Sequence, residues 1–314
     1  MDFESILGKK VRGIGIILPL LPEQFVSIGE EVAIQKILKA VRLAERLGAR
    51  LVALGGFTSI IGNEGEVISK LVNIPVISGN AFPAYLSIEG IEKACKKMHI
   101  KMSDSCAAVI GATGDIGSIC TKILSKKVKK LYLVARNEIR VRRFFDEIRV
   151  RAKAEIVIPA DIDEAIINSD IILTATTAIA SIIDPLKLKP GSIVCDVAVP
   201  ANIVKDVVNL RKDVLVFEGG LTKVPNIEKI RDPKFHKAML SNNCIFGCLA
   251  EAILLTMEDR FESFSIGRGN ITEEKINEIG VIARKHGFEV SNFFCVYKLF
   301  SDEDIDQIRK NANR

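Results

Sequence analysis

A short apolar run that leads into three spaced glycines constrains the fold of this chain more than any other feature. The run covers residues 106–110, and a helix-like stretch continues to about Ser125. A strand, a tight turn and a helix start in this order present unpaired backbone N–H groups to a dinucleotide pyrophosphate. Side chains at the glycines would block the phosphates or the packing of helix on strand. A similar turn without nucleotide is the alternative. The residues expected to contact the cofactor here are Gly111, Thr113, Gly114, Asp115, Ile116 and Gly117.

The next apolar run, 129–135, predicts a second strand, which ends at Ala135, Arg136 and Asn137. In this fold an acidic residue about 20 positions after the glycines holds the ribose hydroxyls of NAD, whereas an arginine suits the 2′-phosphate of NADP. Arg136 therefore predicts NADP(H), and Ala135 and Asn137 are expected beside it. Arg140, Arg142 and Arg143 on the following helix add to the positive field there, and a solvated basic helix is the alternative explanation for some of them.

Strands and helices alternate from residue 101 to about 235. The predicted strands are 106–111, 129–135, 154–158, 169–174, 191–196 and 213–218, and the predicted helices are 115–126, 137–149 and 161–167. Alternation at this spacing predicts an α/β fold, a doubly wound parallel-sheet Rossmann domain. Ligands bind beyond the carboxyl ends of such strands. The residues expected to surround the nicotinamide are Thr174, Ala175, Thr176, Val197 and Gly219.

The first hundred residues predict a separate α/β substrate domain. A helix is expected over 30–47, with Ala33, Ile37, Ala40, Val41 and Ala44 on one face, followed by a short strand at 51–54 and, later, a helix over 83–98. Two turns in apolar surroundings, at 55–61 and 78–83, indicate a cleft. The residues expected to bind substrate there are Phe57, Thr58, Ser59, Gly79 and Asn80.

Composition narrows the class of protein. The 314 residues are enough for two domains, the net charge is +5, and no apolar run reaches the length of a membrane span. Seven cysteines without paired spacing and a start at 1–5 without a signal sequence predict a reduced, cytoplasmic protein. Three histidines and no paired-cysteine motif argue against a metal site, and the aromatic residues are not interleaved with basic ones as in nucleic-acid binders.

The C-terminal part, 236–314, predicts a helical domain. A nearly all-apolar helix is expected from Asn243 to Met257, with Ser241, Asn242 or Asn243 as its N-cap. Cys244 and Cys248 would share one face of it. A thiol near a helix start is activated, because the thiolate is favoured there, and periodicity alone favours Cys244. Small core residues are the other interpretation of both cysteines.

Several segments resemble the long-chain fatty acyl-[acyl-carrier-protein] reductase family, which forms fatty aldehydes. The shared segments are 53–61, 79–80 with 84–85, 109–118, 135–137, 219–220, 246–252 with 254–258, 264–272 and the stretch from Arg284 to Phe288. The Gly-Gly-Phe-Thr-Ser-Ile-Ile and Cys-x-Ala-Glu-Ala elements are far more specific than the glycine turn.

This resemblance implies NADPH as cofactor and a fatty acyl thioester, on acyl-carrier protein or coenzyme A, as substrate. It assigns the acyl-accepting cysteine to Cys248, overruling the preference for Cys244. The oxyanion donors are then N–H groups at the helix start or the hydroxyls of Thr58 and Ser59. Glu251, one turn from Cys248, could handle a proton, but an exposed salt bridge is its expected role, and His286 is expected at a helix end rather than as a catalytic base. The positive net charge would suit an acidic carrier protein, and contact with a membrane surface is an open alternative.

The chain also departs from that family. Family members extend several tens of residues further at the N-terminus, residues 81–83 differ, and 195–200 are more similar to glutamyl-tRNA reductase. These differences leave the cofactor and the nucleophile in place, but they leave the acyl chain length and the choice of carrier open. Two functions of other classes are the alternatives. One is an NADP-dependent dehydrogenase of the shikimate type, without a nucleophilic cysteine, and the other is a non-catalytic NADP(H)-binding regulator.

Overall fold

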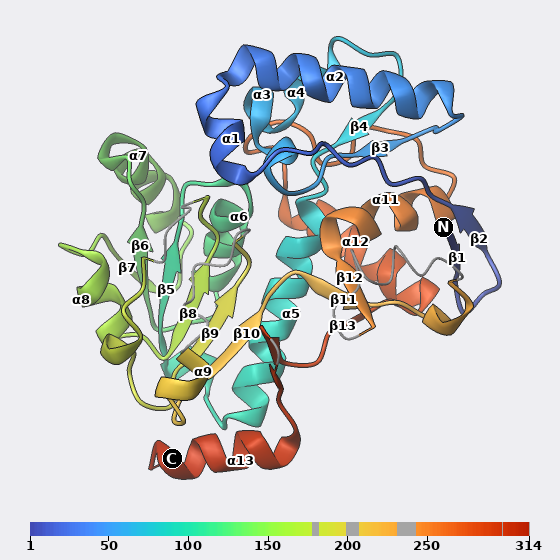
Figure 1. The fold of residues 1–314 in the computed structure, drawn as a ribbon. Helices are drawn as coiled ribbons and strands as arrows, with labels where there is room; N and C mark the ends of the chain where they lie inside the picture. Colours follow the sequence, from blue (N-terminus) through green and yellow to red (C-terminus); the bar gives the residue numbers. More distant parts are fainter. Residues whose placement is uncertain (178–181, 199–206, 231–242, 297, 314) are drawn as a thin grey trace. The chain divides into compact units, whose positions relative to one another are not determined.

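The computed structural model describes residues 1–177, 182–198, 207–230, 243–296 and 298–313 (Figure 1). The chain divides into two compact units, which are not consecutive in sequence. Unit 1 comprises Met1–Leu86 and Gly220–Ser291, and unit 2 comprises Ser87–Gly219 and Asn292–Arg314. These boundaries differ from the three-part division into 1–100, 101–235 and 236–314, which stays a prediction about independently folding domains.

Unit 2 contains a six-stranded parallel sheet in the order β10-β9-β8-β5-β6-β7. Its strands are β5 (Cys106–Ile110), β6 (Lys130–Val134), β7 (Glu155–Val157), β8 (Ile171–Thr174), β9 (Ile193–Asp196) and β10 (Leu215–Glu218). The chain runs outward from β5 to β7 and then crosses to β8 on the other side of β5. This is the strand order of the doubly wound Rossmann fold, with its topological switch point between β5 and β8. The predicted α/β fold class is confirmed.

The helices of unit 2 follow their strands as the spacing predicts. They are α6 (Asp115–Leu124), α7 (Glu138–Arg149), α8 (Ile162–Ile167), α9 (Val207–Leu210) and α13 (Asp302–Asn311), with 3-10 turns η2 (Met102–Asp104) and η3 (Pro185–Lys187) and a hairpin of β14 (Phe294–Cys295) and β15 (Lys298–Leu299). Apolar residues such as Ile119 and Leu124 of α6 and Ile172 of β8 are fully or almost fully buried. Burial of this apolar surface stabilises the layered arrangement.

The first part of unit 1 packs helices on a two-stranded parallel sheet. It contains the hairpin β1 (Asp2–Glu4) and β2 (Lys10–Arg12), the helices α1 (Pro22–Ser27), α2 (Glu30–Arg46), α3 (Ile61–Glu64) and α4 (Glu66–Ser69), the 3-10 turn η1 (Gly56–Ser59), and the strands β3 (Val52–Ala53) and β4 (Val76–Ile77). The predicted apolar face of α2 is buried, except that Ala40 is half-buried. Ile37 and Val41 pack against Leu54 and Val76 in one core cluster.

The second part of unit 1 corrects one prediction. A three-stranded antiparallel sheet forms from β11 (Leu221–Lys223), β12 (Cys244–Phe246) and β13 (Glu289–Val290), and helices α11 (Gly247–Met257) and α12 (Glu273–His286) accompany it, with a 3-10 turn η4 (Ile227–Lys229). Cys244 thus lies in a strand, where Lys223 is its partner in the ladder, and the helix begins only at Gly247. The predicted helix start at Asn243 and the shared face of Cys244 and Cys248 are wrong. The proposed caps Ser241 and Asn242 lie outside the described residues.

Helix α5 (Ala81–Lys97) begins in unit 1 and ends in unit 2, and it starts two residues earlier than the predicted helix over 83–98. No helix within the described ranges is both long enough and apolar enough to cross a lipid bilayer.

Candidate functional site

The glycine turn between β5 and α6 has the close packing that a pyrophosphate cradle requires. Gly111 has a φ of +90°, and a Cβ built there would lie 2.4 Å from the Ala175 carbonyl oxygen. A Cβ on Gly117 would lie 2.1 Å from the Gly111 carbonyl oxygen, so the helix approaches the turn only because this residue is glycine. Gly114 is the N-cap of α6, whose first N–H groups lack a side-chain cap. The turn therefore fits a dinucleotide phosphate.

The remaining cofactor-binding predictions lie at the same edge of the sheet. The glycine turn and the start of α6 contain Thr113, Asp115 and Ile116. Strand β6 is followed by Ala135, Arg136 and Asn137, and β8 ends in or is followed by Thr174, Ala175 and Thr176. Val197 follows β9, and Gly219 follows β10. Because carboxyl ends of parallel strands share one edge, the structure brings all of them together within unit 2. Their assignment to the cofactor stays a prediction.

Hydrogen bonds join the ends of β8, β9 and β10. The Val197 N–H donates to the Thr174 carbonyl (2.8 Å), and the Gly219 N–H donates to the Asp196 carbonyl (2.7 Å). The Thr174 hydroxyl donates to the buried Asp196 carboxylate. These hydrogen bonds hold the three strand ends in fixed positions relative to one another, and a binding surface for a nicotinamide ring requires such rigidity.

Arg136 and Asn137 differ in their contacts. The Asn137 side chain caps α7 by accepting the Arg140 N–H at 2.9 Å. Arg136 is exposed, and it forms no ion pair with any residue that the structure describes. Its guanidinium is therefore available to a phosphate.

Cys248 lies at the second position of α11, with its side chain half-buried. The Sγ atom lies 3.9 Å from the position of a Cβ built on Gly55. Burial raises the pKa of this thiol to about 11, and the charge of Glu251 acts in the same direction, whereas backbone N–H groups of Leu249, Gly56 and Cys248 itself lower it. Three N–H groups thus favour negative charge at Sγ, although burial outweighs them.

The predicted substrate-binding residues differ in whether they contact Cys248 or support the surrounding fold. Gly79 packs directly on Cys248, because a Cβ built there would lie 2.6 Å from the Cys248 carbonyl oxygen. The hydroxyls of Thr58 and Ser59 donate to the carbonyls of Gly55 and Gly56, both at 2.8 Å. Phe57 is buried and stacks on Phe25, with ring centroids 6.3 Å apart. Asn80 is also buried, directly before α5. Phe57 therefore supports the core, and backbone N–H groups are better placed than the two hydroxyls to donate at Sγ.

Replacement of Gly79 by alanine is expected to slow alkylation of the Cys248 thiol about 100-fold, since a displacement of about 1 Å at a reacting group has that effect. The new methyl group would press on the main chain of Cys248, and a φ of +73° adds strain. Gly48→Ala is the matched control, because Gly48 also has a positive φ (+86°) but nothing within 4 Å. Rates of thiol alkylation by iodoacetamide in both variants measure the effect; equal rates would contradict it.

Glu251 corrects a second prediction. It is 0% exposed, rather than part of an exposed salt bridge. Its Oε2 accepts the Phe82 N–H at 2.8 Å, and its Oε1 accepts the Ser265 hydroxyl. Ser265 Oγ in turn accepts the Gly79 N–H at 3.0 Å. A buried network therefore joins α11, the first turn of α5 and the residue that packs on Cys248.

Ser265 was missed as part of the site. Its segment, 264–272, carries a motif shared with the reductase family, and this was the signal in the sequence. His286 is the last residue of α12, as expected, and its Nε2 lies 2.5 Å from Glu258 Oε1.

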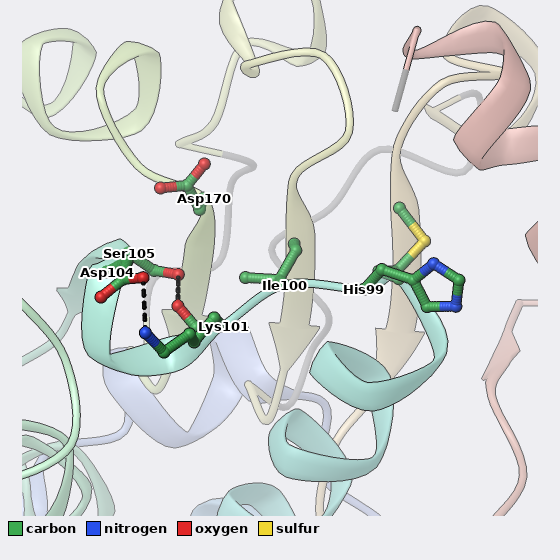
Figure 2. A pocket seen from close by; sticks show the side chains of 7 residues that line it. His99, Ile100, Lys101, Asp104, Ser105 and Asp170 are labelled. Carbon is green, nitrogen blue, oxygen red and sulfur yellow. Dashed lines mark hydrogen bonds and ion pairs between the residues drawn. The ribbon is translucent and has the colours of Figure 1, made fainter.

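A cavity of about 410 Å³ in unit 2 lies elsewhere (Figure 2). It is lined by Met98, His99, Ile100, Lys101, Asp104, Ser105 and Asp170. Ser105 precedes β5 and Asp170 precedes β8, so the cavity lies at the amino ends of the strands, opposite the glycine turn. Its polar groups bond to the protein itself, for example Lys101 to Asp104 at 2.9 Å and Lys189 to Asp170 at 2.8 Å. Across the described residues, no cluster of His, Cys, Asp and Glu could hold a metal ion.

Comparison with known proteins shows similarity to one family model and to several individual proteins. The family model "Shikimate / quinate 5-dehydrogenase" matches residues 92–218, which lie within unit 2. Aminotransferase PigE of Serratia sp. is 29% identical over 97% of this chain, but the chain spans only 35% of that protein. The nucleotide-binding domain of glutamyl-tRNA reductase from Thermoplasma volcanium, a solved structure, has a TM-score of 0.30 and 23% identity, covering 43% of this chain and 84% of its own.

A further relative covers most of both chains. The long-chain acyl-[acyl-carrier-protein] reductase of Synechococcus elongatus is 30% identical over 303 residues, which is 91% of this chain and 84% of the relative. The suspected resemblance is confirmed: the chain belongs to the long-chain acyl-[acyl-carrier-protein] reductase family and is an NAD(P)-dependent oxidoreductase.

Proposed function

We propose that this chain reduces a fatty acyl thioester to a fatty aldehyde with NADPH, through an acyl-enzyme on Cys248. The observation that carries the proposal is the thiol at the start of α11, faced by the N–H groups of Leu249 and Gly56. We place the reaction in the cytoplasm, since seven free cysteines are typical of a reducing compartment.

In the first step the Cys248 thiolate attacks the thioester carbonyl. A new C–S bond forms, the carbon–sulfur bond to the carrier breaks, and the carrier thiolate takes up a proton. Negative charge develops on the carbonyl oxygen, and the helix-start N–H groups are suitable donors for it. Because burial raises the pKa of Cys248 to about 11, the thiol must first lose its proton, and this proton is the one that the carrier thiolate takes up.

In the second step the acyl carbon is reduced. NADPH, when bound, supplies a hydride to that carbon. The resulting Cys248 thiohemiacetal loses its C–S bond, the aldehyde leaves, and the thiol is restored by a proton. The residues that would hold the cofactor are those of the glycine turn, with Arg136 at the 2′-phosphate.

Arg136→Glu is expected to raise the KM for NADPH about 10- to 100-fold, because one charge-assisted contact to the 2′-phosphate is lost and the new carboxylate repels that phosphate. The KM for NADH should stay nearly unchanged, since NADH has no 2′-phosphate. Arg151→Glu, an exposed site just beyond the end of α7, is the matched control. Initial rates with both cofactors measure the effect. Equal losses for NADPH and NADH would contradict a role at the 2′-phosphate.

A single-turnover incubation tests the whole proposal. The protein is mixed with a long-chain acyl-CoA or acyl-carrier protein without NADPH, and intact mass and peptide mapping locate any adduct. An acyl group on Cys248, released as aldehyde when NADPH is added, is the expected result. NADPH binding without any adduct would instead favour the shikimate-type dehydrogenase, which the family match over 92–218 keeps as second candidate.

A further inference from the structure

The solvent face of α2 carries a row of positive charge. Lys36, Lys39, Arg42 and Arg46 are three or four residues apart, so they lie along one side of the helix, and all are exposed. We call these four residues the basic stripe. Glu31 and Glu45 lie near the two ends of the helix rather than within the stripe.

The stripe is not neutralised by the protein. None of its four side chains forms an ion pair with a carboxylate among the described residues, whereas many other lysines and arginines do. On α7, for comparison, Arg149 pairs with Asp146 at 3.2 Å. Positive charge that is left uncompensated attracts an anionic partner.

Apolar side chains accompany the stripe. Val32, Leu43 and Leu47 are 48%, 37% and 52% exposed. Val32 and Leu43 are three or four residues from a member of the stripe, and Leu47 directly follows Arg46 at the end of α2, so this side of α2 combines positive charge with exposed aliphatic surface. Apolar contacts inside a charged rim are typical of protein–protein interfaces.

The stripe and the nucleophile belong to the same unit. The buried side of α2 packs on Leu54 and Val76, and Leu54 directly precedes Gly55, which lies against Cys248. Figure 1 shows α2 along the outer side of unit 1, with β3 and β4 between it and α11. The thickness of α2 and of one sheet layer separates the stripe from Cys248, so the distance between them is about 15–20 Å.

We propose that the basic stripe is the docking surface for an acidic acyl carrier protein, which delivers the thioester to Cys248. This inference rests on the proposed function. Carboxylates on a helix of the carrier would pair with the four cations, and apolar residues of that helix would cover Val32, Leu43 and Leu47. Coenzyme A has no protein body, so an acyl-CoA would not need the stripe.

The double variant Lys39→Glu/Arg46→Glu tests the proposal by comparing two donors of the same acyl chain. We expect the KM for acyl-carrier protein to rise at least about tenfold while the KM for acyl-CoA stays the same. The wild-type KM for the carrier should also rise with salt more steeply than the KM for acyl-CoA. Lys153→Glu/Lys310→Glu, with the same charge change on exposed sites of unit 2, should behave as wild type with both donors.

Other outcomes separate docking from damage to the site and from failure of the proposed function. Unchanged KM values for both donors would show that the carrier docks elsewhere. An equal rise of both KM values would show that the substitutions damage the active site rather than docking. Lys39→Gln/Arg46→Gln would then repeat the test without charge reversal. Wild-type protein inactive with both donors would refute the proposed function alone. Docking is then decided by fluorescence anisotropy of labelled holo-carrier protein, where equal binding by wild type and the reversed variant refutes it. Loss of binding to anionic phospholipid vesicles with unchanged carrier binding would assign the stripe to a membrane.

Discussion

Cys248→Ser is expected to abolish formation of the acyl-enzyme and to lower aldehyde production at least about 1,000-fold. Serine keeps the shape of the side chain, but its hydroxyl is a far weaker nucleophile than a thiolate. The Leu249 and Gly56 N–H groups that favour negative charge at Sγ stay in place and cannot compensate. Intact mass after incubation with a long-chain acyl-CoA measures the adduct, and NADPH oxidation measures turnover.

Cys244→Ser is the matched control for this experiment. Cys244 is only four residues away but lies buried in β12, where its main chain pairs with Lys223. The variant should acquire the adduct and retain most of its turnover. Full activity in Cys248→Ser would exclude the covalent route and favour a dehydrogenase of the shikimate type, and transfer of the adduct to Cys244 would show that the wrong thiol had been assigned.

The parallel sheet of unit 2 could be predicted from the sequence because its signals are local. Each strand is a short apolar run, each helix follows at a regular spacing, and the glycine turn marks the first crossover. The observed strands lie within the predicted ranges, for example β8 (Ile171–Thr174) within 169–174. The carboxyl edge of such a sheet then gathers the predicted cofactor residues without further information.

The surroundings of Cys248 could not be predicted in the same way, because they depend on pairing between distant segments. The run 243–257 is apolar throughout, and an apolar run does not distinguish a strand from a helix. Its first residues form a strand only because β11 (Leu221–Lys223) lies beside them. The choice of Cys248 over Cys244 therefore rests on resemblance to a family rather than on periodicity, and it stays a prediction.

The burial of Glu251 could not be predicted from the sequence for a similar reason. A single glutamate on an apolar helix is usually exposed, and nothing in its local sequence shows that the Phe82 N–H and the Ser265 hydroxyl will meet it. These two donors come from α5 and from the segment after α11, far along the chain on either side. A buried carboxylate is tolerated only where such donors satisfy it.

Glu251→Ala is expected to lower the free energy of unfolding by about 3–5 kcal/mol, because it leaves two buried donors without an acceptor. Glu251→Gln should cost only about 1 kcal/mol, since the amide oxygen can accept the Phe82 N–H and the amide nitrogen can donate to Ser265 Oγ. The glutamine variant thus removes the charge and largely keeps the structure. Chemical denaturation of both variants measures the difference.

The charge of Glu251 also makes a prediction about pH. It acts with burial to raise the pKa of the Cys248 thiol to about 11, so the wild-type thiol should react with iodoacetamide about tenfold faster for each pH unit between 7 and 10. Without the negative charge the thiolate is less disfavoured, and the pKa of Cys248 falls. In Glu251→Gln the alkylation profile should therefore move to lower pH, with faster alkylation at pH 8.

Glu258→Gln separates this electrostatic effect from a general effect of losing a carboxylate. Glu258 follows the same helix and pairs with Lys285 at 2.7 Å, but it lies about 15 Å further along the helix axis from Cys248. Its variant should keep the wild-type profile. An unchanged profile in Glu251→Gln, or the same shift in both variants, would mean that Glu251 only holds the segments around Cys248 together, and that its charge does not act on the thiol.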